Sequence, residues 1–221
     1  AEDYRAHFHT LLPFFTDPRY LKVNGKPIFV IYRPSDIPEV TKVMELWQQM
    51  AVKAGLPGLH LVATIHGRQP WDFRQNGFDA AVMQYLPPLR RHDYVSWQQP
   101  LKKLSRIYQE KTGKPTIYRY RDVMLSMLPD ADSDPQIYPC LVPNWDNTPR
   151  SQHNGLVLQG STPELFRIQL KTALERSRAV PQEQRILFVK SWNEWAEGNH
   201  LEPDLKFGKD YLQIIQEEMS S

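Results

Sequence analysis

Residues 188–204 read FVKSWNEWAEGNHLEPD, and this stretch decides how the rest of the chain is interpreted. It continues an apolar run from Ile186 to Val189 that predicts a buried strand. Two tryptophans, asparagine and four carboxylates follow within thirteen residues, and Gly198 and Pro203 end the regular structure. Because tryptophan faces stack on sugar rings and carboxylates bind hydroxyls, this pattern predicts a sugar site at the mouth of an α/β barrel.

Glu194 and Glu197 are the candidate catalytic pair. If residues 193–197 turn helically, both carboxylates lie on one face, about 5–6 Å apart at Cβ. That spacing is close to the roughly 5–5.5 Å between the carboxyl groups of retaining glycosidases. Repulsion between the two groups and the indole walls would give them different pKa values, and so an acid and a base. The alternative interpretation is a capped, solvated loop with Trp192 and Trp195 in the core.

The motif Trp192–Gly198, followed by Leu201–Asp204, resembles the signature of the WbsX-like glycosyltransferases of bacterial polysaccharide loci. It is also similar to the related endo-α-mannosidase and endo-α-mannanase family, glycoside hydrolase family 99. Ala196 stands where the hydrolase branch usually has His, which favours the WbsX-like branch. Further stretches that carry the resemblance lie in order along the chain: 17–20, 24–27, 30–34 and 143–150.

Composition narrows the class of protein. The chain of 221 residues is long enough for one domain with a full core. Its net charge of +2, with acids and bases interspersed, gives no electrostatic footprint for nucleic acid. No apolar run is long enough for a membrane span, and no segment reads as a signal peptide. The single cysteine, Cys140, has apolar neighbours and is expected to be a buried, inert thiol, so we expect a cytoplasmic protein.

Apolar runs and helical periodicity alternate along the chain. The pattern predicts helices at 3–15, 38–54, 97–111, 163–178 and 208–219, with Ser161 or Thr162 capping the fourth. It predicts parallel strands near 28–32, 59–65, 79–84, 137–142 and 186–190, adjacent and in that order. Residues 116–128 are ambiguous, with a strand-like start and then a short helix. Strands without polar alternation, separated by amphipathic helices, indicate a parallel sheet covered on both faces.

Polar and aromatic residues recur where these strands end, which is where α/β folds place their chemistry. Each residue alone has a structural interpretation: Tyr32 and Tyr85 as core aromatics, His66 as a turn residue, and Asp146 as an Asx-turn. Trp145 is expected to be exposed at the same end of the sheet as the Glu194 loop. The candidate substrate-binding residues are Trp192, Asn193, Trp195, Trp145, Asp146, Asn147, Arg150, Tyr32, Arg33, Tyr85, His66 and Glu202.

The resemblance implies a (β/α)8 TIM-type barrel, whereas the pattern predicts only five strands. We therefore interpret residues 1–221 as the C-terminal five β/α units of one glycan-active barrel domain, whose first three units have no counterpart here. An open five-stranded sheet would expose apolar edges.

The leading functional hypothesis is a WbsX-like glycosyltransferase that acts on α-linked sugars in surface-polysaccharide (O-antigen) assembly. The resemblance implies that Glu194 is the base and that Glu197 acts as acid or base at the glycosidic oxygen. Endo-α-mannosidase-like hydrolysis would use the same residues, with water as the acceptor. A non-catalytic glycan-binding domain would keep the aromatic residues without needing both glutamates. A glycan or sugar donor is the expected partner, and the chain gives no sign of a cofactor or phosphate loop. A metal hydrolase is disfavoured because His60, His66 and His200 lack ligand spacing.

Overall fold

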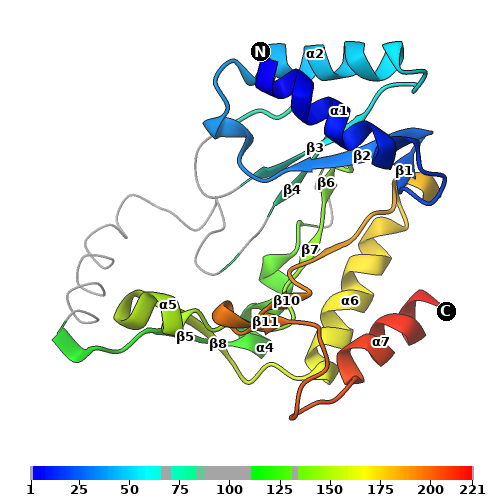
Figure 1. Cartoon of the computed structure of the whole chain (residues 1–221). Coiled ribbons are helices and arrows are strands. Elements are labelled where there is room, and N and C mark those ends of the chain that lie inside the picture. Colours follow the sequence, from blue (N-terminus) through cyan, green and yellow to red (C-terminus); the bar gives the residue numbers. More distant parts are fainter. Residues whose placement is uncertain (1, 66–70, 84–85, 87–110, 131–133, 221) are drawn as a thin grey trace. The chain divides into compact units, whose positions relative to one another are not determined.

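The computed structural model of the chain describes residues 2–65, 71–83, 86, 111–130 and 134–220 (Figure 1). The chain divides into two compact units, each assembled from separate segments. Unit 1 comprises residues 1–84, 132–138 and 179–186, and unit 2 comprises residues 85–131, 139–178 and 187–221.

Unit 1 contains a parallel sheet. Among its described residues the strand order is β1-β2-β3-β4-β6. Strand β1 (Lys22–Val23) pairs antiparallel with the start of β2 (Lys26–Ile31). The next neighbours, β3 (His60–Ile65), β4 (Ala80–Met83) and β6 (Ile137–Tyr138), all run parallel to β2. Strand β3 is buried from its first residue to its fifth, as expected for a strand covered on both faces.

Two helices, α1 (Glu2–Thr16) and α2 (Val40–Lys53), share an apolar cluster with this sheet (Figure 1). The Trp47 ring packs against Phe29 of β2 with ring centroids 5.1 Å apart, and its Nε1 donates to the Tyr4 carbonyl at 3.0 Å. The short 3-10 turns of unit 1 are η1 (Pro34–Asp36) and η6 (Gln182–Gln184). The face predicted for the 38–54 helix is buried throughout, which confirms its phase: Val40, Val43, Met44, Trp47 and Met50.

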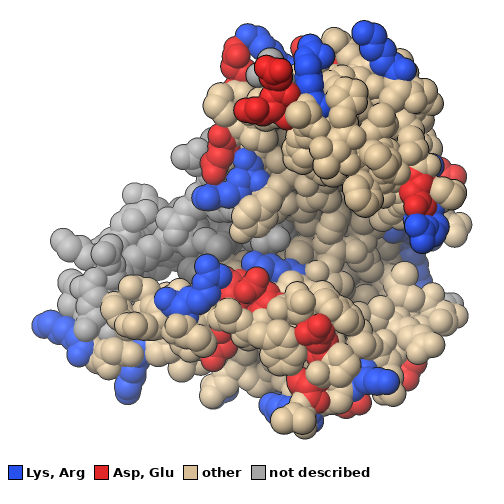
Figure 2. Space-filling model, in the orientation of Figure 1, with Lys and Arg blue, Asp and Glu red and all other residues tan. Residues whose placement is uncertain are grey.

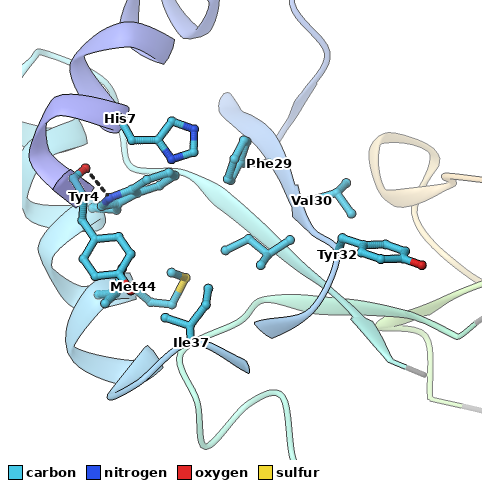
Figure 3. A pocket seen from close by; sticks show the side chains of 10 residues that line it. Tyr4, His7, Phe29, Val30, Tyr32, Ile37 and Met44 are labelled. Carbon is cyan, nitrogen blue, oxygen red and sulfur yellow. Dashed lines mark hydrogen bonds between the residues drawn. The ribbon is translucent and has the colours of Figure 1, made fainter. Parts of the chain in front are cut away.

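An apolar groove of about 210 Å³ opens in unit 1 beside β2 (Figure 3). Among the described residues, β2 pairs with β1 only at Lys26 and Pro27, so the far side of its later residues has no strand partner. Val30 and Tyr32 are 37% and 62% exposed there. Over the described residues, β2 therefore has an open edge of the kind that the sequence predicts. The groove is lined by Tyr4, His7, Phe29, Val30, Ile31, Tyr32, Ile37, Val43, Met44 and Trp47.

The amino ends of the strands in unit 1 meet at a small polar cavity of about 140 Å³. His60 Nε2 and the Tyr138 hydroxyl are hydrogen-bonded at 2.8 Å, and Lys26 Nζ lies 3.8 Å from the Asp79 carboxylate. Asp79 also accepts from the Leu61 amide at 2.8 Å. Burial lowers the pKa of His60 and raises that of Tyr138 to about 12, so both groups are held neutral around pH 7.

Unit 2 contains three two-stranded pairs among its described residues. The parallel pairs are β5 (Thr116–Arg119) with β8 (Leu156–Gln159), and β7 (Cys140–Leu141) with β9 (Phe188–Val189). The third pair is the antiparallel hairpin of β10 (Asn193–Glu194) and β11 (Asn199–His200). Cys140 is buried, and burial raises the pKa of its thiol to about 12, so the expected buried, inert cysteine is confirmed.

Helices α6 (Pro163–Ser177) and α7 (Asp210–Met219) pack on each other, and Arg167 bonds both Glu217 and Glu218. Thr162 caps α6 by accepting from the Leu165 amide at 3.3 Å. The buried amide of Gln169 joins α6 to its neighbours: it donates to the Met124 carbonyl at 2.7 Å. The shorter helical segments of unit 2 are α4 (Tyr120–Val123), η4 (Met124–Met127), α5 (Thr148–Ser151), η5 (Gln152–Asn154) and η7 (Trp195–Glu197).

The predicted order and parallel direction are confirmed for the first four predicted strands, and the last predicted strand pairs in parallel with β7 in a separate two-stranded sheet. Two predicted strands have different bounds. The strand predicted at 137–142 is divided by Pro139, which has no N–H for a ladder; β6 pairs with β4 and β7 pairs with β9. The last predicted strand is shorter, starting at Phe188. Strand β8 was not predicted, and the strand-like start at Thr116 is β5. The predicted helix at 97–111 lies outside the described residues except for its last position.

Charged side chains are mixed on the surface. Figure 2 shows lysine and arginine interspersed with aspartate and glutamate on the visible face, in line with the net charge of +2. Within the described part of the chain, none of the helices combines the length and apolar character that crossing a bilayer requires.

Candidate active site

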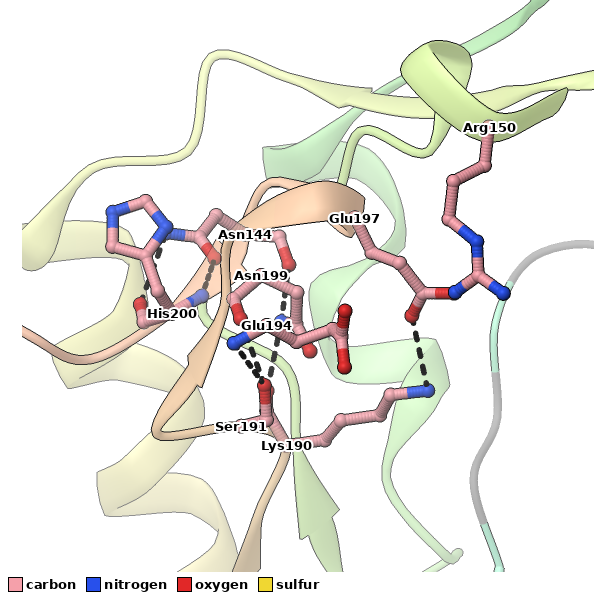
Figure 4. A network of polar contacts seen from close by, with 8 residues as sticks. All are labelled: Asn144, Arg150, Lys190, Ser191, Glu194, Glu197, Asn199 and His200. Carbon is pink, nitrogen blue, oxygen red and sulfur yellow. Dashed lines mark hydrogen bonds and ion pairs between the residues drawn. The ribbon is translucent and has the colours of Figure 1, made fainter. Parts of the chain in front are cut away.

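The two candidate glutamates lie on one hairpin (Figure 4). Glu194 ends β10, directly opposite Asn199 of β11, and Glu197 ends the 3-10 turn η7 that joins the two strands. The expectation of a helical turn over 193–197 is therefore only partly right, since the helical part is Trp195–Glu197. Gly198 closes the turn with φ +52°, and a Cβ there would lie 3.1 Å from the backbone of Asp146, so the position favours glycine twice over.

Two asparagine side chains, Asn199 and Asn144, fix the base of this hairpin (Figure 4). Asn199 is fully buried, and its Nδ2 donates to the carbonyls of Asn144 at 2.6 Å and Lys190 at 2.8 Å. The Asn144 side chain in turn accepts from the His200 amide at 2.9 Å. Ser191 Oγ donates to the Asn199 carbonyl at 2.8 Å. These bonds satisfy buried backbone groups, and they hold the segment carrying both glutamates against the end of β7.

The two carboxyl groups have different surroundings. Glu197 Oε1 accepts from Arg150 Nη1 at 2.9 Å, while its Oε2 lies 3.7 Å from Lys190 Nζ; the Glu197 side chain is 17% exposed. Glu194 is exposed, and its carboxyl has no hydrogen bond or ion pair to any residue that the structure describes. In Figure 4 both side chains leave the hairpin on the same side. One carboxylate is thus held by cations, and the other is free to meet a ligand.

Trp192 and Trp195 are 52% and 49% exposed, which confirms that they are surface indoles rather than core. Trp195 stacks on His200 with ring centroids 3.8 Å apart, and its Nε1 donates to Glu202 at 2.7 Å. The remaining face of the Trp195 ring is available to solvent. Glu202 therefore orients an indole, which the sequence could not show.

His200 is itself held by Asp204, with His200 Nε2 3.1 Å from the carboxylate. Burial acts to raise the pKa of Asp204, but hydrogen bonds from the Phe207 amide and from His200 outweigh it, so the pKa lies below its usual value. The same carboxylate accepts from the Lys206 and Phe207 amides. No set of three or more His, Cys, Asp or Glu side chains within the described ranges is arranged to hold a metal ion.

The expectation that Trp145 is exposed is wrong. Trp145 is 6% exposed and packs in a cluster with Tyr120, Met127 and Leu158. A ring enclosed in this way has no free face for a sugar. The strand pattern could not reveal this, because the residues that cover the ring come from distant segments of the chain. Trp145 is accordingly removed from the sugar-stacking set.

Asp146 and Asn147 shape the backbone. Asp146 Oδ1 accepts from the Thr148 amide at 3.0 Å, which is the Asx-turn anticipated as its structural role. Its amide donates to the Glu197 carbonyl at 2.7 Å. Asn147 Oδ1 accepts from the Leu156 amide at 2.7 Å and so fixes the start of β8. Asp146 thus supports the hairpin and Asn147 supports β8. Because these hydrogen bonds already occupy polar groups of both residues, fewer of those groups are left to bind a ligand.

The remaining predicted residues have different outcomes. Asn193 is exposed on β10 of the hairpin. Tyr32 and Arg33 follow β2 in unit 1, where Arg33 pairs with Asp36 at 3.2 Å, and their role at the Glu194 hairpin stays a prediction. His66 and Tyr85 lie outside the described residues. The structure adds four residues to the site: Lys190, Asn144, Asn199 and His200. The only signal for them in the sequence was the dense polar composition after β9.

Comparison with known proteins places the chain in a family. The model of the family described as Glycosyltransferase WbsX matches residues 1–215. The chain is 29% identical over 221 residues to the uncharacterized protein WxcX of Xanthomonas campestris pv. campestris, in strain B100 and equally in strain ATCC 33913. The match covers 100% of this chain, which spans only 30% of the length of those curated relatives.

Two solved structures share the fold. One is a glycoside hydrolase-like protein, with TM-score 0.57 and 15% identity, matched over 97% of this chain and 60% of its own. The other is the GH99 endo-alpha-mannosidase from Bacteroides thetaiotaomicron, with TM-score 0.59 and 14% identity, matched over 98% and 62%. This chain thus has a mixed α/β fold like that of these two proteins. Because the family model covers nearly the whole chain, the protein belongs to the WbsX glycosyltransferase family, a group of carbohydrate-active enzymes.

Proposed function

We propose that this chain carries the catalytic hairpin of an enzyme that acts on α-linked sugars during assembly of a bacterial surface polysaccharide. The observation that supports it most is the hairpin itself: two glutamates stand on one short segment beside two half-exposed indoles. In this proposal Glu194 is the base that deprotonates a sugar hydroxyl or acts at the anomeric carbon. Glu197 exchanges a proton with the glycosidic oxygen. Trp195 and Trp192 stack on sugar rings, and we expect the protein in the cytoplasm.

Transfer to an acceptor sugar is the leading reaction, because the chain belongs to a glycosyltransferase family. Hydrolysis is the second candidate, favoured by the fold shared with an endo-alpha-mannosidase. Both reactions need the same carboxylates and differ in what attacks the anomeric carbon. Incubation with an α-linked oligosaccharide in ¹⁸O-labelled water, with and without acceptor sugar, separates them: hydrolysis puts the label in the reducing sugar, and transfer yields an unlabelled longer glycan.

The catalytic pair is tested in the full-length protein. Glu194→Gln and Glu197→Gln should each lower turnover by about 10²–10⁴, the usual contribution of one acid–base carboxylate. Sugar binding, followed by calorimetry, should survive because the amide keeps the shape of the side chain. Glu183→Gln, an exposed glutamate of η6, is the matched control and should leave turnover unchanged. A Gln variant of the pair with near wild-type turnover would remove that residue from catalysis. Sugar binding without any turnover in the parent protein would point to a binding domain.

We propose further that the strands described here are the later part of an eight-stranded barrel, five β/α units within one domain. The open edge of β2, with Val30 and Tyr32 exposed beside an apolar groove, supports this, as does the 60–62% coverage of the two solved neighbours. In the full-length protein, strands from elsewhere in the chain would pair with β2. Hydrogen exchange at the Val30 amide should then be markedly slower in the full-length protein than in the 221-residue chain, and equal rates would contradict the proposal.

A further inference from the structure

Lys190 occupies a fixed position directly after β9. Its amide donates to the Leu141 carbonyl at 2.9 Å, and its carbonyl accepts from the buried Asn199 side chain at 2.8 Å. Bonds on both sides of the Cα leave this backbone little freedom. The lysine side chain is only 20% exposed. It therefore starts from a rigid point and runs through a partly enclosed space.

The ammonium group of Lys190 lies between an aromatic face and a carboxylate. Its Nζ is 4.4 Å from the centroid of the Trp145 ring and 3.7 Å from Glu197 Oε2. The first distance is within the range of a cation–π interaction. The other oxygen of Glu197 accepts from Arg150 at 2.9 Å. Each oxygen of the Glu197 carboxylate thus faces its own cation.

This arrangement also gives the enclosed Trp145 a function. An ion pair between two partly buried side chains gains most when something holds both groups in place. The face of Trp145 that meets Lys190 gives the ammonium group a second contact besides the carboxylate. Loss of Lys190 would leave the Glu197 carboxylate, 17% exposed, with Arg150 as its single cationic partner among the described residues.

We propose that Lys190 is a positioning residue of the active site: supported by the Trp145 ring, it fixes the direction of the Glu197 carboxyl group and places a positive charge beside it. The inference rests on the proposed function of the hairpin and assigns a role that the chemistry of the two glutamates does not itself require. It predicts that the two carboxyl groups differ in reactivity before any substrate arrives. The Glu197 carboxyl group faces two cations, and the Glu194 carboxyl group pairs with none of the described side chains.

Carboxyl labelling tests this without any catalytic activity. A water-soluble carbodiimide with glycine ethyl ester converts protonated carboxyl groups to amides, and peptide mass spectrometry of the full-length protein measures the rate at each glutamate. At about pH 5, where ordinary carboxyl groups are partly protonated, Lys190→Met should raise the labelling rate of Glu197 about three- to tenfold. The rate at Glu194 should not change, which makes it the internal reference.

Lys206→Met is the matched control, because Lys206 also lies over an aromatic ring, Phe207, at 4.6 Å but has no part in the Glu197 pair. It should leave the labelling of Glu197 unchanged. Trp145→Phe keeps a ring under the ammonium group and should behave nearly like the parent protein. Trp145→Leu should raise Glu197 labelling as Lys190→Met does, provided that its circular dichroism is native. Unchanged Glu197 labelling in Lys190→Met, or an equal rise in Lys206→Met, overturns the inference.

The pH–rate profile supplies the second readout. Removal of a nearby cation disfavours the carboxylate, so Lys190→Met should move to higher pH whichever limb of the profile Glu197 governs, and Lys190→Arg should restore it. Loss of turnover with an unmoved limb would mean that Lys190 matters only for folding, against the inference. If the parent protein turns over no glycan but the labelling changes as expected, the proposed function fails and the role of Lys190 stands. If both glutamates are needed for turnover but Lys190→Met changes neither the labelling nor the pH–rate profile, the proposed function stands and the role of Lys190 fails.

Discussion

The indole of Trp195 lies flat on the imidazole of His200, with ring centroids 3.8 Å apart and planes inclined by 18°. Glu202 holds the indole nitrogen at 2.7 Å, and Asp204 holds the imidazole at 3.1 Å. One face of Trp195 is therefore occupied, and the ring is fixed in orientation. The other face is left as a preformed flat surface.

Trp195→Ala should weaken binding of an α-linked oligosaccharide by at least about tenfold, because a fixed aromatic anchor loses little entropy when a ligand binds. Trp192→Ala should cost less, since the Trp192 indole has no ring contact to the described residues that would hold it in place. Calorimetry on the full-length variants measures both. Equal affinities for Trp195→Ala and the parent protein would exclude Trp195 as the anchor.

Trp47→Ala should lower the free energy of unfolding by about 3–5 kcal/mol, the usual cost of removing a large buried aromatic ring. Trp47 is 2% exposed, packs on Phe29 and bonds the Tyr4 carbonyl, so the substitution removes contacts between α2, α1 and the sheet. A urea melt measures it, with the half-exposed Trp192→Ala as control, for which about 0.5 kcal/mol or less is expected. A loss for Trp47→Ala within that same range would contradict the packing described here.

His60 should make the protein less stable in mild acid. Burial, the main cause, lowers the pKa of His60 in the folded state below the 6.5 of an unfolded chain, so the unfolded state binds a proton more readily. The stabilising contribution is present above pH 6.5 and is lost as pH falls through the lower folded-state pKa. Urea melts at about pH 7 and about pH 5 should show a smaller loss of stability in His60→Gln than in the parent protein. His9→Gln, at an exposed position of α1, should lose as much stability between the two pH values as the parent protein. If His60→Gln loses that same amount, groups other than His60 cause the loss of stability in acid.

The sequence predicted the elements whose side chains repeat with a clear period. The apolar face of α2 and the continuous apolar run of β3 each determine which side must be buried, and both were predicted correctly. Strand β8 could not be recognised so readily, because Leu156 and Val157 are only half-buried and the strand is short. Its pairing with β5 depends on contacts between distant segments.

The candidate site was predicted as a composition rather than as a geometry. The density of carboxylates and indoles after β9 indicated where the site lies. The sequence there contains no turn dipeptide that would predict the pairing of β10 with β11. Whether an aromatic residue after a strand is covered or exposed depends on the rest of the chain, which is why Trp145 was assigned wrongly. The partnership of Lys190 with Glu197 follows from how the backbone turns, and spacing along the sequence does not contain it.

The segments of the two units alternate along the chain, and this determines the order in which each unit can be completed during synthesis. Unit 1 acquires most of its residues by position 84, yet the outer strand of its sheet, β6, arrives only at 137–138, and η6 only at 182–184. Until then the edge of β4 that will pair with β6 is open, and such edges recruit other strands. A nascent chain must therefore keep a half-finished sheet soluble while residues 85–131 of unit 2 are being translated, and a ribosome that stalls in that interval would release a fragment prone to aggregation.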